Sequence, residues 1–175
     1  MALEFKVSGP PVTAARHDRS IASAAVDVGA APVPWSGAMP LRLVIDTNVL
    51  VAALLTPGRT PDRALAAVFA RGDRVLYDPR MEAEYRAVLA RPKFRAINPA
   101  AADALLAALF AGAERLEAVP AWGGAMTDAD DRAFVEVALA GGADALVTGN
   151  GRHYPTDLAF AVLSPAALLE RIAGY

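Results

Sequence analysis

The sequence predicts an α/β protein in which helices cover both faces of a parallel sheet. Three observations favour this class: short apolar runs alternate with helical segments, several of those segments open with a capping residue followed by proline, and glycine or proline ends them. With 175 residues, 55% of them hydrophobic and 21% charged, the chain has the size and composition of one globular domain.

The first expected element is a strand over residues 41–46, an apolar run that suits a buried parallel strand. Further strands are expected at 75–77, 115–119 (weaker), 145–148 and 159–163. Helices are expected at 49–55, 60–71, 79–91, 99–112, 130–140 and from 165 onward. Caps followed by proline stand at Thr60-Pro61, Asp78-Pro79, Asn98-Pro99 and Ser164-Pro165. Pro92 and the pair Gly141-Gly142 end the third and fifth helices.

Residues 1–40 differ from the rest of the chain. They hold Pro10, Pro11, Pro32, Pro34 and Pro40 and show neither a helical nor a strand period. We therefore expect a poorly ordered leader over 1–40 and a domain over 41–175. Our hypothesis is that Met39 is the natural start, and a chain beginning there that failed to fold would contradict it.

Composition and charge exclude several classes of function. The net charge of −2 argues against nucleic-acid binding by overall positive potential, although a local basic rim remains compatible with it. The absence of cysteine leaves carboxylates, amides and histidine as the only metal ligands. No apolar run approaches the roughly 18 residues that span a bilayer, and Glu4 and Lys6 interrupt the place of a signal peptide. We therefore expect a cytoplasmic protein without a membrane segment.

Acidic and amide side chains follow two of the expected strands. Asp46 ends the first strand, and Asn150 follows the strand that ends at Thr148. Three further acids stand where the 130–140 helix begins: Asp128, Asp130 and Asp131. Ligands of open parallel sheets gather beyond the carboxyl ends of the strands. Because a buried carboxylate needs a cation or hydrogen-bond donors, and few cations are near in the sequence, a divalent metal is the most economical partner.

The helix expected at 130–140 has acids toward its apolar side. On a helical wheel Asp130 and Asp131 fall within or beside the inward arc, whereas Arg132 and Glu136 form an i,i+4 pair on the opposite face. Inward-pointing acids are unusual, which favours a functional role.

Each of these acids also has a purely structural interpretation. Asp128 can be an N-cap, and Asp130 and Asp131 can simply favour the positive end of the helix dipole. On the 79–91 helix, Glu82 and Glu84 flank the apolar stripe on opposite sides, so the wheel does not choose between them and either can be solvated.

At this point the residues resemble a known family. The segment Leu43-Val44-Ile45-Asp46-Thr47-Asn48-Val49-Leu50-Val51 is similar to the opening of PIN domains. Further matches follow in order: Glu84 within Glu-Tyr-Arg-Ala-Val-Leu, Arg91-Pro92-Lys93-Phe94, Asp128-x-x-Asp131-x-x-Phe134, and Leu146-Val147-Thr148-Gly149-Asn150 with His153 close behind. Together they cover about residues 41–170 and resemble the PIN domains that are toxins of type II toxin-antitoxin systems.

The resemblance implies a three-layer α/β/α sandwich with a central parallel sheet, whose acids bind Mg²⁺ or Mn²⁺ and cleave RNA. Asp46, Glu84 and Asp131 match the three core acids of the family, and Asn150 matches a fourth position that is Asp in many members. Expected supporting residues are Asn48, Asp128, Asp130 and Thr148. The amide of Asn150 brings no negative charge, so a second metal would bind more weakly or only with substrate. The resemblance also implies a cognate antitoxin protein and a homodimer.

Substrate phosphates need cations at the rim of such a site. The candidates are Arg59, Arg91, Lys93, Arg152 and His153. His153 can equally be a loop histidine satisfied by a backbone carbonyl.

Three other classes of function are alternatives to a ribonuclease. Phosphotransferases of the haloacid-dehalogenase type need a second Asp two residues after the strand-terminal one, where this chain has Asn48. The more serious rival is a weak or inactive PIN-like domain that binds RNA or protein. A small α/β domain of another role is the third.

Overall fold

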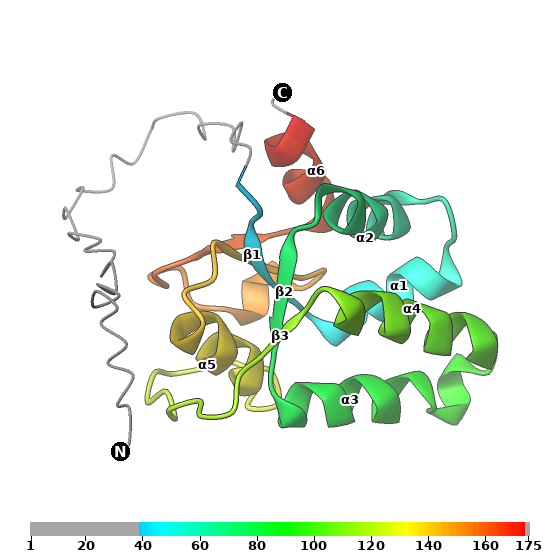
Figure 1. The fold of residues 1–175 in the computed structure, drawn as a ribbon. Helices are drawn as coiled ribbons and strands as arrows, with labels where there is room; N and C mark the ends of the chain where they lie inside the picture. The colour runs from blue at the N-terminus through cyan, green and yellow to red at the C-terminus, as the bar shows by residue number, and fades with distance from the viewer. Residues whose placement is uncertain (1–38, 174–175) are drawn as a thin grey trace, which may run out of the picture. The chain divides into compact units, whose positions relative to one another are not determined.

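The computed structural model describes residues 39–173, in which one sheet of five parallel strands has the order β3-β2-β1-β4-β5 (Figure 1). The strands are β1 (Arg42–Ile45), β2 (Arg74–Tyr77), β3 (Glu114–Arg115), β4 (Ala145–Val147) and β5 (Ala161–Leu163). The α-helices are α1 (Thr47–Leu55), α2 (Thr60–Arg71), α3 (Pro79–Leu89), α4 (Pro99–Ala111), α5 (Arg132–Ala140) and α6 (Pro165–Ala173). Two 3₁₀ turns are η1 (Pro92–Phe94) and η2 (Gly151–His153). The leader expected over 1–40 lies outside the described residues except for Met39 and Pro40.

Helices cover both faces of the sheet, as the sequence predicts. α5 packs on β1, β2 and β4, while α2 packs against α1 and α6. Figure 1 shows α5 on one side of the strands and α1, α2 and α4 on the other. The prediction of a three-layer α/β/α sandwich is thus confirmed. Over residues 39–173, none of the helices has the length and apolar character needed to cross a bilayer.

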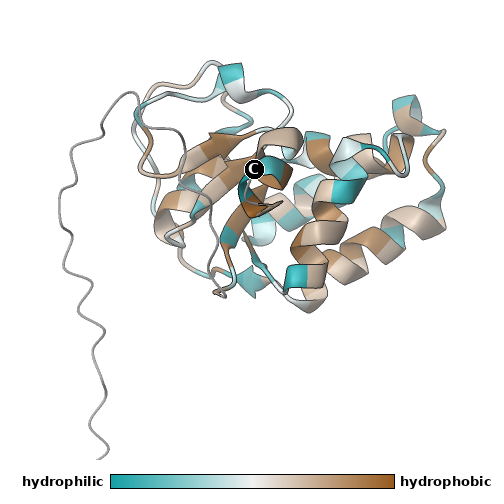
Figure 2. Cartoon of the chain, turned by 90° about the horizontal axis from the view of Figure 1, so that it is seen from above, coloured by the Kyte–Doolittle hydropathy of each residue, from teal (hydrophilic) through white to brown (hydrophobic). Residues whose placement is uncertain are grey.

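The core is built on the two central strands. Leu43, Val44 and Ile45 of β1 are fully buried, and the three residues of β4 are buried as completely. Figure 2 shows hydrophobic residues concentrated in the strands. Burial on both faces explains why residues 43–45 of β1 and all of β4 are apolar instead of alternating with polar residues.

Helix capping follows the predicted cap-plus-proline pattern in three of four cases. The side chain of Asp78 accepts hydrogen bonds from the N–H groups of Arg80 and Met81, and those of Asn98 and Ser164 accept one each at α4 and α6. At α2 the expectation is wrong by one residue: Arg59 occupies the N-cap without a side-chain bond, and Thr60 is already helical.

The start of α5 also differs from the prediction. The helix begins at Arg132, so Asp130 and Asp131 precede it, and Asp131 stands at the N-cap position without a capping hydrogen bond. Asp128 accepts from the N–H of Asp130 (3.0 Å) in the turn before the helix.

The predicted Arg132–Glu136 pair is wrong. Glu136 is 3% exposed and accepts from the Trp122 N–H (3.0 Å) and from Arg80 (2.6 Å), whereas Arg132 donates to the carbonyl of Trp122. The helical wheel assumed one buried face, but the loop that carries Trp122 also binds both of these side chains.

The two outer strands are shorter than predicted. β3 covers two residues instead of 115–119, and β5 begins at Ala161 instead of residue 159. As edge strands they have one hydrogen-bonded neighbour each, β2 for β3 and β4 for β5, so pairing extends only as far as that neighbour reaches.

Candidate active site

A cleft lies at the carboxyl end of the central strands. The chain leaves β1 toward β2 and later returns on its other side as β4, so β1 and β4 form the switch point of the sheet, where α/β proteins bind ligands. Asp46 follows β1, and its N–H donates to Val147 of β4 (2.9 Å). The cleft has a volume of about 480 Å³. Nine of the site residues predicted from the sequence line it: Asp46, Asn48, Glu84, Arg91, Lys93, Asp128, Asp131, Asn150 and His153.

Asp46 is the most completely hydrogen-bonded acid of the cleft. It is 4% exposed, and its Oδ2 accepts from Asn48 Nδ2 (2.8 Å), Thr148 Oγ1 (2.7 Å) and Tyr154 OH (3.1 Å). Its Oδ1 accepts from the Asn48 N–H (3.0 Å). Four donors hold the carboxylate in one orientation at the base of the cleft and compensate for its burial.

Asn48 ties the two central strands together behind Asp46. Its Nδ2 also donates to Thr148 Oγ1 (3.2 Å), and its Oδ1 accepts from the Gly149 N–H (2.8 Å). A Cβ on Gly149 would lie 3.2 Å from that oxygen, so a side chain there would push the Asn48 amide by a few tenths of an ångström. The Thr148 hydroxyl in turn accepts from the Asn150 N–H (3.0 Å), which fixes the loop after β4. Asn48 and Thr148, which we predicted as supporting residues, therefore position Asp46.

Glu84 and Asp131 face Asp46 from two other elements. Glu84 lies on α3 and accepts a hydrogen bond from Thr47 Oγ1 (2.7 Å), and Asp131 precedes α5 with its Oδ2 at 3.4 Å from His153 Nδ1. Burial raises the pKa of Glu84, Thr47 opposes that rise, and the charges of Asp46 and Asp131 add to it. The pKa of Asp131 is raised by burial and by the charge of Asp46, against the lowering effect of His153. The fold therefore holds these acids together at an electrostatic cost.

The donor set suits a hard divalent cation. Oxygen ligands predominate, and the cost of gathering Asp46, Glu84 and Asp131 is what a bound cation would offset. Asp131 also belongs to a second group of potential ligands. One ligand atom each of Asp128, Asp131 and His153 lies within 4.8 Å of the others, close enough for the three to share an ion. The residues present therefore fit a divalent-metal site.

Glu82 and Glu84 are clearly separated by the structure. Glu84 lines the cleft, whereas Glu82 pairs with Arg86 (3.0 Å) one turn along the same helix. This separation agrees with the choice of Glu84 that the resemblance implied.

Some of the remaining predicted residues line the cleft and others do not. Asn150 is exposed at the start of η2 and lines the cleft, as do Arg91 and Lys93. Asp130 and Arg152 are exposed and do not line it, although the charge of Asp130 contributes to the raised pKa of Glu84. Arg59, at the start of α2, does not line the cleft either.

Two tyrosines that the sequence did not single out support the site. Tyr154 is 5% exposed and donates to Asp46, and burial together with the charge of Asp46 raises its pKa, so the hydroxyl stays a donor. Tyr85, fully buried on α3, donates to the carbonyl of Ile45, the last residue of β1. An aromatic residue in a polar loop after η2 was the only available signal for Tyr154.

The structure defines a class of protein: a parallel α/β/α sandwich whose acidic cleft at the switch point of the sheet fits a divalent ion. Comparison with protein-family models makes the identity more specific, because the PIN domain model matches residues 42–152. The chain belongs to the PIN domain family, a nuclease fold. No curated protein and no solved structure matched the chain in the same comparisons.

Proposed function

We propose that the protein is a divalent-metal-dependent endoribonuclease centred on Asp46, Glu84 and Asp131. One observation carries the proposal: these carboxylates come from three separate elements and line one cleft at the switch point. Two of them, Glu84 and Asp131, have raised pKa values because burial disfavours their charged forms and the charges of the neighbouring acids add to this effect. Membership of a nuclease family supports it.

The residues have distinct roles in this proposal. Asp46, Glu84 and Asp131 would hold Mg²⁺ or Mn²⁺, and four donors fix the orientation of the Asp46 carboxylate. The ion would neutralise charge on the scissile phosphate and acidify water for hydrolysis. Arg91 and Lys93 stand at the cleft to contact neighbouring phosphates of the RNA.

Asn150 supports the second candidate function, a weak or inactive domain that binds RNA or protein. Its side chain lines the cleft but supplies no charge, which limits binding of a second ion. A cleavage assay on a labelled RNA, titrated with Mg²⁺ and with Mn²⁺ and stopped by chelator, separates the two candidates. Metal-dependent cleavage that Asn150→Asp increases supports the nuclease; RNA binding without cleavage at any metal concentration supports the binding module.

We further propose that the protein is the toxin of a toxin-antitoxin pair, acting on cytoplasmic RNA as a homodimer and held inactive by a cognate antitoxin. The order of the motifs from Asp46 to His153 supports this assignment. Induced expression should arrest growth, and the product of a neighbouring gene should relieve the arrest. Undiminished growth with an active, well-expressed ribonuclease would refute the toxin role alone.

A further inference from the structure

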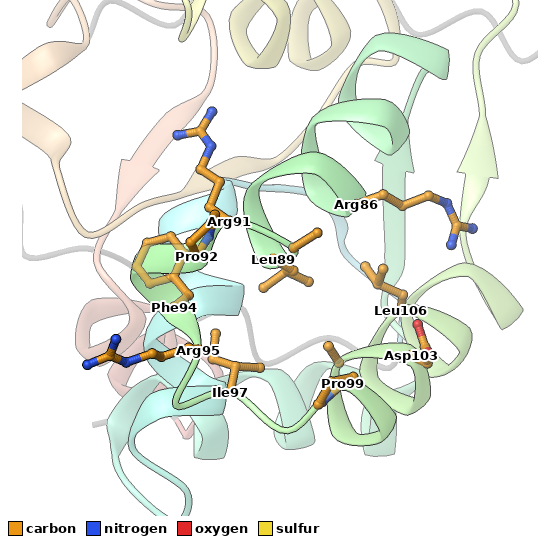
Figure 3. A pocket seen from close by; sticks show the side chains of 12 residues that line it. Arg86, Leu89, Arg91, Pro92, Phe94, Arg95, Ile97, Pro99, Asp103 and Leu106 are labelled. Atoms are coloured by element: carbon orange, nitrogen blue, oxygen red, sulfur yellow. The ribbon is translucent and has the colours of Figure 1, made fainter.

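A second pocket adjoins the acidic cleft. It lies between α3, η1 and α4 and has a volume of about 590 Å³, within the range of small-ligand sites. Its floor is apolar: Leu89, Ile97, Ala102 and Leu106 are 4–9% exposed and surround its centre. Figure 3 shows Leu89, Ile97 and Leu106 around the pocket, with Phe94 on one side.

The pocket and the acidic cleft share residues. Arg91 and Phe94 line both, so a ligand that fills the acidic cleft and continues along this surface reaches the pocket directly. Phe94 offers an aromatic ring at the junction, with Lys93 Nζ at 4.8 Å from its centroid. The two hollows thus adjoin at Arg91 and Phe94, with the acids lining one and an apolar floor in the other.

The rim of the pocket is basic in a chain whose net charge is −2. Arg86, Arg91 and Arg95 surround it, and Asp103 is its one acid. Arg86 is engaged with Glu82, but within residues 39–173 neither Arg91 nor Arg95 forms an ion pair. Figure 3 shows the head groups of all three arginines directed away from the apolar centre. The charge arrangement therefore suits a ligand with an apolar body and flanking anions.

We propose that this pocket binds a nucleobase of a single-stranded RNA, next to the phosphate held in the acidic cleft, while Arg91 and Arg95 contact the flanking phosphates. The inference rests on the proposed ribonuclease function and names the part of the substrate that the protein reads. Unpaired bases are flat, largely apolar groups linked by phosphates, and proteins bind them through apolar or aromatic surfaces beside cations. A single RNA strand matches both hollows and their shared residues.

The test compares binding of a short single-stranded RNA with binding of the same strand made abasic, both in excess chelator so that no cleavage occurs. Fluorescence anisotropy gives the two dissociation constants. For the natural protein we expect the RNA to bind about tenfold more tightly than the abasic strand, as one buried base would contribute. Ala102→Phe fills the floor and should bring the two constants toward equality. Ala102 is mostly buried, so a phenylalanine there can also disturb folding. Ala90→Leu, at the exposed mouth of the pocket, is therefore the second filling variant.

Matched controls lie on α2, away from both hollows. Ala66→Leu adds the same side chain as Ala90→Leu at an exposed helical position and should keep the preference for bases. Arg95→Glu should weaken RNA and abasic strand alike and lower the salt dependence of binding, whereas Arg63→Glu should leave both unchanged.

Equal binding of the two strands by the natural protein would overturn the base pocket, as would a preference for bases that survives both filling variants. If an acidic amphipathic peptide binds more tightly than the RNA, and Ala90→Leu abolishes that binding, the pocket belongs to a protein partner instead. Binding is measured without metal, so it is independent of the metal-titrated cleavage assay. Base-dependent binding by a protein that does not cleave RNA refutes only the proposed ribonuclease. Cleavage by a protein whose binding does not depend on the base refutes only the base pocket.

Discussion

Replacing Glu84 by glutamine should have opposite effects on the metal-free and the metal-loaded protein. Without metal, Glu84→Gln removes one of the charges that Asp46 and Asp131 repel, while the amide oxygen can still accept the hydrogen bond from Thr47. With metal, the same change removes a ligand. The metal-free protein should therefore become more stable and lose its capacity to be stabilised by metal.

The magnitudes follow from the exposure of the cleft. Glu84 is only half buried, so the relief of like-charge repulsion is screened by water and contributes about 0.5 kcal/mol. For a domain of this size that corresponds to a rise of about 2 °C in Tm. Metal at about 100 times its dissociation constant should stabilise the natural protein by about 2.7 kcal/mol. In Glu84→Gln most of this gain should disappear.

The pH dependence has a definite sign. Because the pKa of Glu84 is raised from 4.5, the folded metal-free protein binds more protons than the unfolded chain in the pH window just above that value. Its free energy of unfolding therefore decreases as pH rises through the raised pKa. Asp131, with its pKa also raised, acts in the same direction, and Glu84→Gln should make the dependence less steep.

Thermal melting with and without Mn²⁺, across this pH window, measures the change in stability without metal, the stabilisation by metal and the pH dependence. Glu82→Gln is the matched control: it loses an exposed ion pair with Arg86 on the same helix and should leave the metal response intact. A Glu84→Gln protein that is less stable without metal, or that keeps the full stabilisation by metal, would refute the reasoning.

Further changes test the surroundings of the site. Tyr154→Phe removes one donor to Asp46 and should lower the free energy of unfolding by about 1 kcal/mol in a denaturant titration; an unchanged midpoint would contradict the hydrogen bond. Gly149→Ala places a Cβ at 3.2 Å from the Asn48 side chain and should weaken metal binding in calorimetry, whereas unaltered affinity would show that the loop adjusts freely. Asp78→Ala removes the cap of α3 and should cost about 1–2 kcal/mol in thermal melting, and a loss near zero would argue against the cap.

The sequence predicted the fold from features that are local in the chain. Apolar runs and cap-plus-proline pairs are set by neighbouring residues, and these patterns predicted the five strands and six α-helices of the described residues within a few positions, but neither of the 3₁₀ turns. The errors lie where tertiary contacts decide. Glu136 was placed on a solvated face, yet the Trp122 loop and Arg80 bury it, and no local pattern records that loop.

The site was predictable where a chain position alone determines geometry. An acid that ends a parallel strand lies at the carboxyl edge of the sheet, so the positions of Asp46 and Asn150 at that edge followed from the strands. The choice between Glu82 and Glu84 needed the resemblance, because both flank the same stripe. The donation from Tyr154 to Asp46 joins residues 108 positions apart through an irregular turn, which local periodicity does not encode.

The most direct test of the central claim is RNA cleavage by Asp46→Asn in the presence of Mn²⁺. The substitution keeps the size of the side chain and removes the charge at the base of the cleft. We predict that the purified natural protein cleaves RNA only with divalent metal, and that Asp46→Asn, shown by circular dichroism to be folded at the assay temperature, does not. Cleavage by Asp46→Asn at the natural rate would contradict the assignment of the site.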